Sequence, residues 1–274
     1  MLTLNSLILA AATSLAAMSA NATEGIPDLS KIVKVSLLKG WQLENGDHIG
    51  ALRVTLASGW KTYWRLSGDS GLPPVFDWSN SVNLDHVSYL WPRPEILEAN
   101  GITILGYRHE LVLPILFHPA SPGQAISARA ELELGICRDV CVPVQVNLEQ
   151  ELDQEPGADR LLIDLALAER PIEAADLGMP EPECTIIATD QGYRLSARLH
   201  LPASVTQREM VVFEPAEPDI WVTAGTTRRQ GETLLAETTL TKFFSGPFTI
   251  NPNHLRLTVL GDDRAIAITG CKVN

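Results

Sequence analysis

Short apolar runs that alternate with polar residues dominate this chain and constrain its fold more than any other feature. In the first half they include HELVLPILFH, AISARAELEL and VPVQVNLE, and several of the runs show the period of two that is typical of half-buried strands. The turn-forming stretches ENGD, SGDSGLPP and HPASPGQ separate these runs. Strands at this spacing, with no helical pattern between them, predict an antiparallel β-sandwich over residues 23–150.

An acidic segment interrupts the strand pattern in the middle of the chain. Residues 149–183 hold eleven Asp or Glu against two Arg, so they carry −9 of the formal net charge of −12. Within the segment, residues 158–170 are predicted to form a short amphipathic helix, which Pro171 ends. The apolar face of this helix is expected at Leu161, Leu162, Leu165 and Ala168. We interpret residues 151–182 as an acidic linker with a short helix.

Strand-like runs resume at Cys184 and continue to the end of the chain, as in YRLSARLHL, EMVVFEP and AIAITGCKV. They predict a second, smaller β-sandwich over residues 183–274. The predicted fold class is therefore all-β, with two antiparallel sandwich domains. Nucleic acid and anionic lipid are excluded as expected partners, because an acidic surface gains nothing from counterion release.

The first 22 residues are typical of a secretory signal peptide. An apolar run extends from Leu7 to Ala17, and the small residues Ala20 and Ala22 suggest cleavage before Thr23. The apolar run is shorter than the roughly 20 residues that a membrane span needs. No Lys or Arg precedes it, so an uncleaved anchor stays an alternative. We expect an exported protein whose mature part has no membrane insertion.

Four cysteines in an exported chain suggest disulfides, and loop length separates the two pairs. In the chain-entropy model, closing the loop of about 88 residues between Cys184 and Cys271 contributes roughly 4.6 kcal/mol. Closing the five residues from Cys137 to Cys141 contributes only about 2 kcal/mol on the same formula. We therefore expect Cys184 and Cys271 to form a structural disulfide, and the short pair to have another purpose.

The short pair can bond only if the chain turns sharply between its members. Residues four apart in a strand lie about 13 Å apart, beyond the reach of a disulfide. A three-residue hairpin loop, Arg138-Asp139-Val140, would place Cys137 opposite Cys141. The charge of Arg138 would favour a thiolate and that of Asp139 would oppose it, while Pro143 would set the direction in which the chain leaves the hairpin.

Three stretches in order carry a family resemblance: GWKTYWRLSGDSGLPPVFDW, WPRPEILEANGITILGYRHELVLPI and ARAELELGICRDVCVP. They resemble the N-terminal periplasmic domain of the thiol:disulfide interchange protein DsbD, and most closely the ScsB (suppressor of copper sensitivity) branch. The three-residue gap between Cys137 and Cys141 matches that branch, whereas the DsbD domain has a longer gap. The resemblance implies an immunoglobulin-like fold for the sandwich and a periplasmic location.

The same resemblance implies a redox role without a cofactor. Cys137 and Cys141 would be the catalytic pair of a thiol-disulfide oxidoreductase, which would pass electrons from a membrane-embedded thiol reductase to periplasmic thioredoxin-fold proteins. Tyr63 and Trp64 would lie beside this pair. The segment RPEILEANGIT would match the family's cap loop, with Ile96 or Leu97 where an aromatic residue often stands. The electron donor would be a separate polypeptide.

Two other classes of function stay open at this point. Two thiolates four residues apart also suit Cu(I), so Cys137 and Cys141 could bind copper in tolerance or delivery. Zinc would need two further ligands, which the sequence does not provide at matching spacing. The chain could also be an interaction module without redox activity. Trp60 and Trp78 are expected to pack in the sandwich core.

Overall fold

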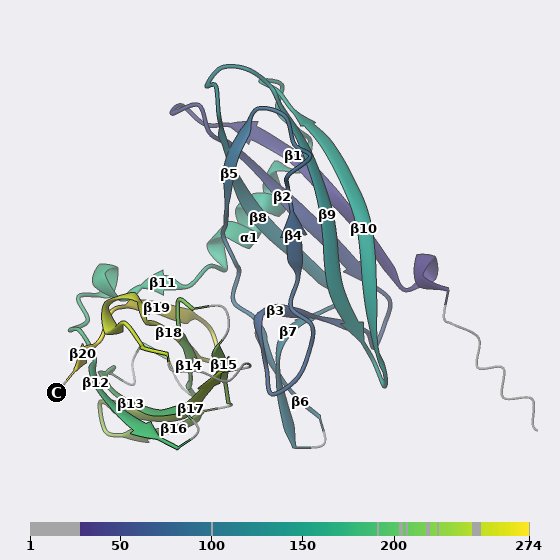
Figure 1. Ribbon diagram of the computed structural model, residues 1–274. Helices are drawn as coiled ribbons and strands as arrows, with labels where there is room; N and C mark the ends of the chain where they lie inside the picture. The colour runs from purple at the N-terminus through teal and green to yellow at the C-terminus, as the bar shows by residue number, and fades with distance from the viewer. Residues whose placement is uncertain are drawn as a thin grey trace, which may run out of the picture.

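The computed structural model describes residues 28–273 except 100, 191, 203–204, 207, 218–219, 224 and 243–247. The predicted signal peptide and its cleavage site lie outside the described residues. The chain forms two β-sandwiches, with a connecting segment that contains the helix α1 (Figure 1). The all-β fold class with two sandwiches is therefore confirmed.

The first sandwich consists of two antiparallel sheets, which we call sheet A and sheet B. In spatial order, sheet A contains β1 (Val33–Gln42), β2 (His48–Leu56), β8 (Glu110–Pro119) and β5 (Leu84–Tyr89). In spatial order, sheet B contains β10 (Cys141–Leu152), β9 (Ile126–Cys137), β3 (Lys61–Gly68), β7 (Ile102–Arg108) and β6 (Glu95–Ala99). The short strand β4 (Val75–Asp77) also pairs with β9, and the 3-10 turn η1 (Leu29–Lys31) precedes β1.

Alternation along β9 shows why these residues form a sandwich. Ile126, Ala128, Leu132, Leu134 and Ile136 are buried in one core. The charged residues Arg129, Glu131 and Glu133 between them are exposed, as the period of two requires. Sheet A contributes apolar residues such as Leu52 and Leu113 to the same core. Each fully buried side chain of this size stabilises the fold by about 1.5–3 kcal/mol relative to exposure.

The helix α1 (Arg160–Ala168) covers the outer face of sheet A, and of the four residues predicted for its apolar face only Leu162 is partly buried there. Ile163 and Ala166 are its buried residues, whereas Leu161 and Leu165 are 73% and 59% exposed. The segment before the helix is attached to sheet A, because the Gly157 amide donates to the Gly40 carbonyl of β1 at 2.6 Å.

The second sandwich also has two sheets, which we call sheet C and sheet D. In spatial order, sheet C contains β11 (Ile172–Glu173), β19 (Ala265–Thr269), β18 (Arg256–Leu260) and β14 (Met210–Glu214). In spatial order, sheet D contains β15 (Ile220–Val222), β17 (Thr233–Lys242), β13 (Gly192–His200), β12 (Glu183–Thr189) and β20 (Lys272–Val273), and β16 (Thr226–Gln230) also pairs with β17. The 3-10 turns η2 (Ala174–Leu177) and η3 (Pro252–His254) lie outside the sheets. Two pairings, β11 with β19 and β12 with β20, are parallel, and the others are antiparallel.

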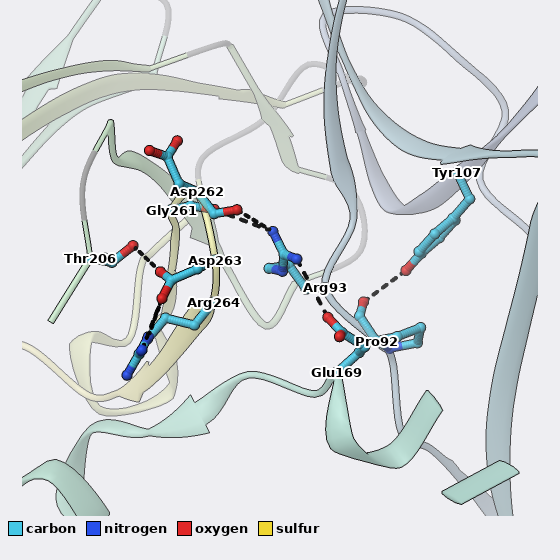
Figure 2. A network of polar contacts seen from close by, with 9 residues as sticks. All are labelled: Pro92, Arg93, Tyr107, Glu169, Thr206, Gly261, Asp262, Asp263 and Arg264. Atoms are coloured by element: carbon cyan, nitrogen blue, oxygen red, sulfur yellow. Dashed lines mark hydrogen bonds and ion pairs between the residues drawn. The ribbon is translucent and has the colours of Figure 1, made fainter. Parts of the chain in front are cut away.

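Polar contacts join the two sandwiches where the segment before β6 meets the turn between β18 and β19 (Figure 2). The Arg93 guanidinium donates to the carbonyls of Gly261 and Asp262, at 3.4 and 3.1 Å, and lies 3.4 Å from the Glu169 carboxylate. Leu260, which precedes this turn, packs into the core of the first sandwich. The interface therefore combines apolar packing with directional hydrogen bonds, which together define how the sandwiches sit against each other.

Candidate functional site

The hairpin between β9 and β10 brings the two neighbouring cysteines together. Cys137 ends β9, Cys141 begins β10, and the two are directly opposite in the strand register, with Cα atoms 4.2 Å apart. The Arg138 amide donates to the Val140 carbonyl at 3.3 Å across the turn. The two sulfurs are bonded as a disulfide.

The two sulfurs lie in different surroundings. Cys137 is only 2% exposed and belongs to a small apolar cluster with Tyr63, Leu97 and Ile104. This cluster is separate from the sandwich core and lies on the opposite, outer face of sheet B. Cys141 is exposed. An incoming group therefore reaches the Cys141 side of the disulfide first.

Tyr63 contacts both sulfurs from the middle of β3. Its hydroxyl oxygen lies 2.6 Å from the Cys137 sulfur and 3.1 Å from the Cys141 sulfur. Burial raises the pKa of Tyr63, because the charged phenolate is poorly solvated there. The phenol therefore keeps its proton at neutral pH and can donate a hydrogen bond to a sulfur.

Two glycines make room for the Tyr63 ring. A Cβ built on Gly71 would lie 2.2 Å from the ring, and one built on Gly135 would lie 3.0 Å from it. Gly71 also has a φ of +141°, a conformation that side-chain-bearing residues rarely adopt. The loop after β3 can therefore press directly against the ring and hold it over the sulfurs.

Lys61 is a residue beside the cysteines that the sequence analysis did not single out. It is the register partner of Cys137 on β3, and its ammonium lies 3.5 Å from the Arg138 carbonyl. Directly opposite residues of an antiparallel pair project to the same face, so Lys61 shares the sulfur face. Lys61 and Tyr63 are two residues apart in a strand-like run, and alternate residues of a strand share a face. The sequence could therefore have predicted that Lys61 lies on the same face as Tyr63.

The structure separates the other residues that the sequence analysis proposed for the site. Trp64 lies in the sandwich core on the opposite face of sheet B from the sulfurs, and Trp60 is in the same core. Leu97 of β6 joins the cysteine cluster, whereas the neighbouring Ile96 packs against the sandwich core. The segment proposed as a cap loop thus forms β6 and the start of β7.

The charged hairpin residues Arg138 and Asp139 are exposed, and so is Pro143. The Arg138 guanidinium donates to the Asp139 carboxylate at 3.0 Å and lies 5.4 Å from the centre of the Trp60 ring. Pro143 on β10 is directly opposite Gly135 on β9. The charge of Arg138 is therefore partly balanced by its own neighbour.

The second cysteine pair has a different environment. Cys184 near the start of β12 and Cys271 just before β20 are bonded, with Cα atoms 5.8 Å apart. Both are buried in the core of the second sandwich, with exposed fractions of 1% and 2%. This disulfide joins the two ends of that sandwich and offers no sulfur to an incoming thiolate.

No group of three or more His, Cys, Asp or Glu side chains comes together as a metal site within the part of the chain that the structure describes. The Cu(I) hypothesis therefore gains no support from the geometry. Among the same residues, no helix has both the length and the apolar character that crossing a bilayer requires.

Comparisons with known proteins agree with this architecture. Residues 34–153 match the family described as thiol:disulfide interchange protein DsbD, N-terminal. The crystal structure of the N-terminal periplasmic domain of ScsB from Proteus mirabilis shares the fold, with a TM-score of 0.65 at 20% sequence identity. The likeness covers 88% of this chain and 92% of that chain, and so includes both sandwiches. No curated protein matches the chain.

The matched residues 34–153 contain both sheets of the first sandwich from β1 to β10, and therefore the entire cysteine hairpin with Tyr63 and Lys61. Residues 34–153 of this chain are therefore a DsbD N-terminal-like domain, and the chain shares the fold of the ScsB N-terminal periplasmic domain.

Proposed function

We propose that this protein relays reducing equivalents in the periplasm through reversible opening of the Cys137–Cys141 disulfide. The observation that carries the proposal is the unequal exposure of the two bonded cysteines, with Cys141 exposed and Cys137 2% exposed beside Tyr63. Such a pair offers one sulfur for attack and keeps the other as a shielded leaving group. In this role the protein is a thiol-disulfide oxidoreductase of the protein-disulfide reductase type, without a cofactor.

The loading step follows from this geometry. A thiolate of the electron donor attacks the Cys141 sulfur, the bond to Cys137 breaks, and its electron pair stays on Cys137 as a thiolate. The second thiolate of the donor then attacks its own sulfur in the mixed disulfide and releases Cys141 as a thiolate. The donor dithiol becomes a disulfide, and this protein gains two electrons.

Two side chains stabilise the thiolate that forms on Cys137. The Tyr63 hydroxyl can donate to it from the observed contact of 2.6 Å. The positive charge of Lys61 lies on the same face of the sheet. Unloading is the reverse sequence: the Cys141 thiolate attacks a disulfide of the acceptor, and Cys137 resolves the mixed disulfide.

The partners that fit are a membrane-embedded thiol reductase as electron donor and periplasmic thioredoxin-fold proteins as acceptors. The family match supports this class of partner. An exposed apolar rim also supports it, because Val140, Leu72 and Val75 are 71%, 45% and 62% exposed and lie on the hairpin or on the segment beside it. Exposed apolar side chains around a reactive sulfur are typical of a transient docking surface.

Trapping with single cysteine variants tests the proposal. In Cys137→Ala, the exposed Cys141 thiol should form a stable mixed disulfide with a thioredoxin-fold protein whose own resolving cysteine is replaced. In Cys141→Ala, the remaining thiol is buried, so the yield of mixed disulfide should fall at least about tenfold, in line with the dependence of exchange on access. Non-reducing electrophoresis and mass spectrometry measure both yields.

The paired variant Cys184→Ala with Cys271→Ala is the matched control, because it removes a disulfide that is buried in the second sandwich. Combined with Cys137→Ala, it should leave the yield of the mixed disulfide at Cys141 unchanged. Equal trapping by the two single variants would contradict the assigned order of attack. If neither variant forms a mixed disulfide, and the wild-type pair does not equilibrate with glutathione, the proposed redox function is wrong.

A further inference from the structure

Strand β3 connects the cysteine pair directly to the second sandwich. Lys61, Tyr63 and Arg65 are alternate residues of β3, whose pairing with β7 is irregular between Tyr63 and Gly68. Lys61 is the register partner of Cys137, and Tyr63 contacts both sulfurs. Arg65, two residues further on, reaches the carboxylate of Glu214 on β14. Figure 1 shows β3, β6 and β7 at the end of the first sandwich that lies beside the second.

The contact between Arg65 and Glu214 is a partly buried, two-pronged ion pair. The Arg65 Nε lies 2.7 Å from one carboxylate oxygen, and its Nη2 lies 3.0 Å from the other. The exposed fractions of the two side chains are 20% and 10%. The Thr258 hydroxyl also donates to the Glu214 carboxylate. Because parallel hydrogen bonds of this kind tolerate little change in angle, the pair holds β3 in one orientation relative to β14.

The loop that follows β3 touches Tyr63 on one side and faces the second sandwich on the other. Gly71 of this loop lies against the Tyr63 ring, and the Leu72 carbonyl accepts from the Gly135 amide at 3.1 Å. Behind the loop, Gly68, Gly71 and Pro73 line a cavity of about 360 Å³ together with Met210 and Val212 of β14. The loop therefore has space to move on the side where the second sandwich stands.

We propose that the second sandwich is a brace that sets the reactivity of the cysteine pair through Arg65 and Glu214. By holding β3 and the loop over residues 69–73, this ion pair keeps the Tyr63 hydroxyl against the sulfurs and keeps Cys137 covered. Arg65 and Glu214 are positioning residues, since neither touches a sulfur in the described contacts. The inference rests on the proposed redox function and assigns the second sandwich a part in it.

Glu214→Gln in the full chain tests this inference, because it removes the charge but keeps the size of the side chain. With β3 and its loop released, dithiothreitol should reduce the Cys137–Cys141 disulfide about threefold to tenfold faster. The equilibrium with glutathione should move by a similar factor toward the disulfide, because the hydrogen bond from Tyr63 to a thiolate on Cys137 is weakened but not removed. A role in stability alone would not move this equilibrium.

Glu237→Gln is the matched control, because Glu237 pairs with Arg194 at 3.7 Å on the exposed face of sheet D. It should leave both the rate and the equilibrium unchanged. Thr258→Val, which removes only one hydroxyl contact to Glu214, is the milder variant if Glu214→Gln does not fold, and it should show the same changes at smaller size. Exchange of the charges, with Arg65→Glu and Glu214→Arg combined, should restore part of the wild-type equilibrium.

The outcomes separate this inference from the function on which it rests. If the wild-type pair equilibrates with glutathione but folded Glu214→Gln and Thr258→Val have wild-type rates and equilibria, the brace is wrong and the redox function stands. If the wild-type disulfide does not exchange at all, the proposed function itself fails. A change in reduction rate and glutathione equilibrium that Glu214→Gln shows and the control Glu237→Gln lacks supports the brace.

Discussion

The Tyr63 hydroxyl oxygen lies 2.6 Å from the Cys137 sulfur, on the outer face of sheet B and away from the sandwich core. Seventy-four residues separate these two side chains in the sequence, yet β3 and β9 are neighbouring strands. The same oxygen is 3.1 Å from the Cys141 sulfur. One buried phenol can therefore donate to whichever sulfur carries negative charge when the disulfide opens.

Replacement of Tyr63 by phenylalanine should make the Cys137–Cys141 disulfide harder to reduce. The variant keeps the ring in its glycine-lined space but removes the hydroxyl donor. Loss of a hydrogen bond to a charged group changes an equilibrium by about 1.5–3 kcal/mol, which is roughly tenfold or more. Redox titration against glutathione measures the change.

Tyr89→Phe is the control for this prediction, because the Tyr89 hydroxyl accepts from Trp78 and forms no hydrogen bond with a sulfur among the residues described. It should leave the glutathione equilibrium as in the wild type. An unchanged equilibrium in Tyr63→Phe would show that the hydroxyl does not stabilise the thiolate.

Neutralisation of Lys61 should raise the pKa of the more acidic thiol in the reduced protein. A nearby positive charge favours the thiolate, so Lys61→Gln removes a stabilising interaction while Lys61→Arg retains it. We expect an upward shift of about half a unit to one unit at low salt, and less at high salt because of screening. The pH dependence of iodoacetamide alkylation measures the thiol pKa.

Lys34→Gln, an exposed lysine on β1, tests whether any loss of positive charge has the same effect. It should leave the alkylation profile unchanged. A wild-type profile in Lys61→Gln, or a shift of equal size in Lys61→Arg, would count against an electrostatic role for Lys61.

Mild acid should destabilise the first sandwich through His48. Burial lowers the pKa of His48 below its usual 6.5, and its Nε2 lies 2.6 Å from the Lys39 carbonyl. Below pH 6.5 the unfolded chain therefore binds a proton that the folded chain resists. The free energy of unfolding therefore has its full value above this pH, where His48 is neutral in both states. It decreases as the pH falls, by at most about 1.4 kcal/mol per pH unit.

Urea unfolding between pH 5 and pH 7.5 measures this dependence. His48→Gln should flatten it, although the variant will be less stable at neutral pH. The exposed His86 provides a control in His86→Gln, which should keep the wild-type slope. The same slope in all three proteins would exclude His48 as the source.

The two disulfides should differ in both redox behaviour and effect on stability. A glutathione buffer that reduces Cys137–Cys141 should leave Cys184–Cys271 oxidised, because both sulfurs of the second pair are buried. Replacement of Cys184 and Cys271 by alanine should lower the free energy of unfolding by about 2–5 kcal/mol. The Cys137–Cys141 disulfide closes a far shorter loop. Replacement of these two cysteines by alanine should therefore lower the free energy of unfolding by less than about 2 kcal/mol.

Mass spectrometry after alkylation identifies which cysteines are reduced, and urea unfolding measures the two stability changes. Simultaneous reduction of both disulfides in a folded protein would contradict the separation of roles. Equal losses of stability in the two paired variants would contradict the loop-length argument.

The sequence by itself determined the strands and the cysteine hairpin, because both depend on neighbouring residues. The alternation in residues 126–136 predicts one buried and one exposed face, and a three-residue turn places Cys137 opposite Cys141. Loop length likewise separates a structural disulfide from a short one. None of these inferences needs to know how the sheets pack.

Only the tertiary structure decided which side chains meet the sulfurs and which surfaces meet each other. Tyr63 and Trp64 are equally plausible neighbours of the cysteines in the sequence, but the register of β3 turns one toward the sulfurs and the other into the core. Arg65 meets Glu214 although 149 residues separate them. Such contacts depend on the mutual orientation of whole sheets and sandwiches, which arises from many apolar contacts acting together and has no local signature in the chain.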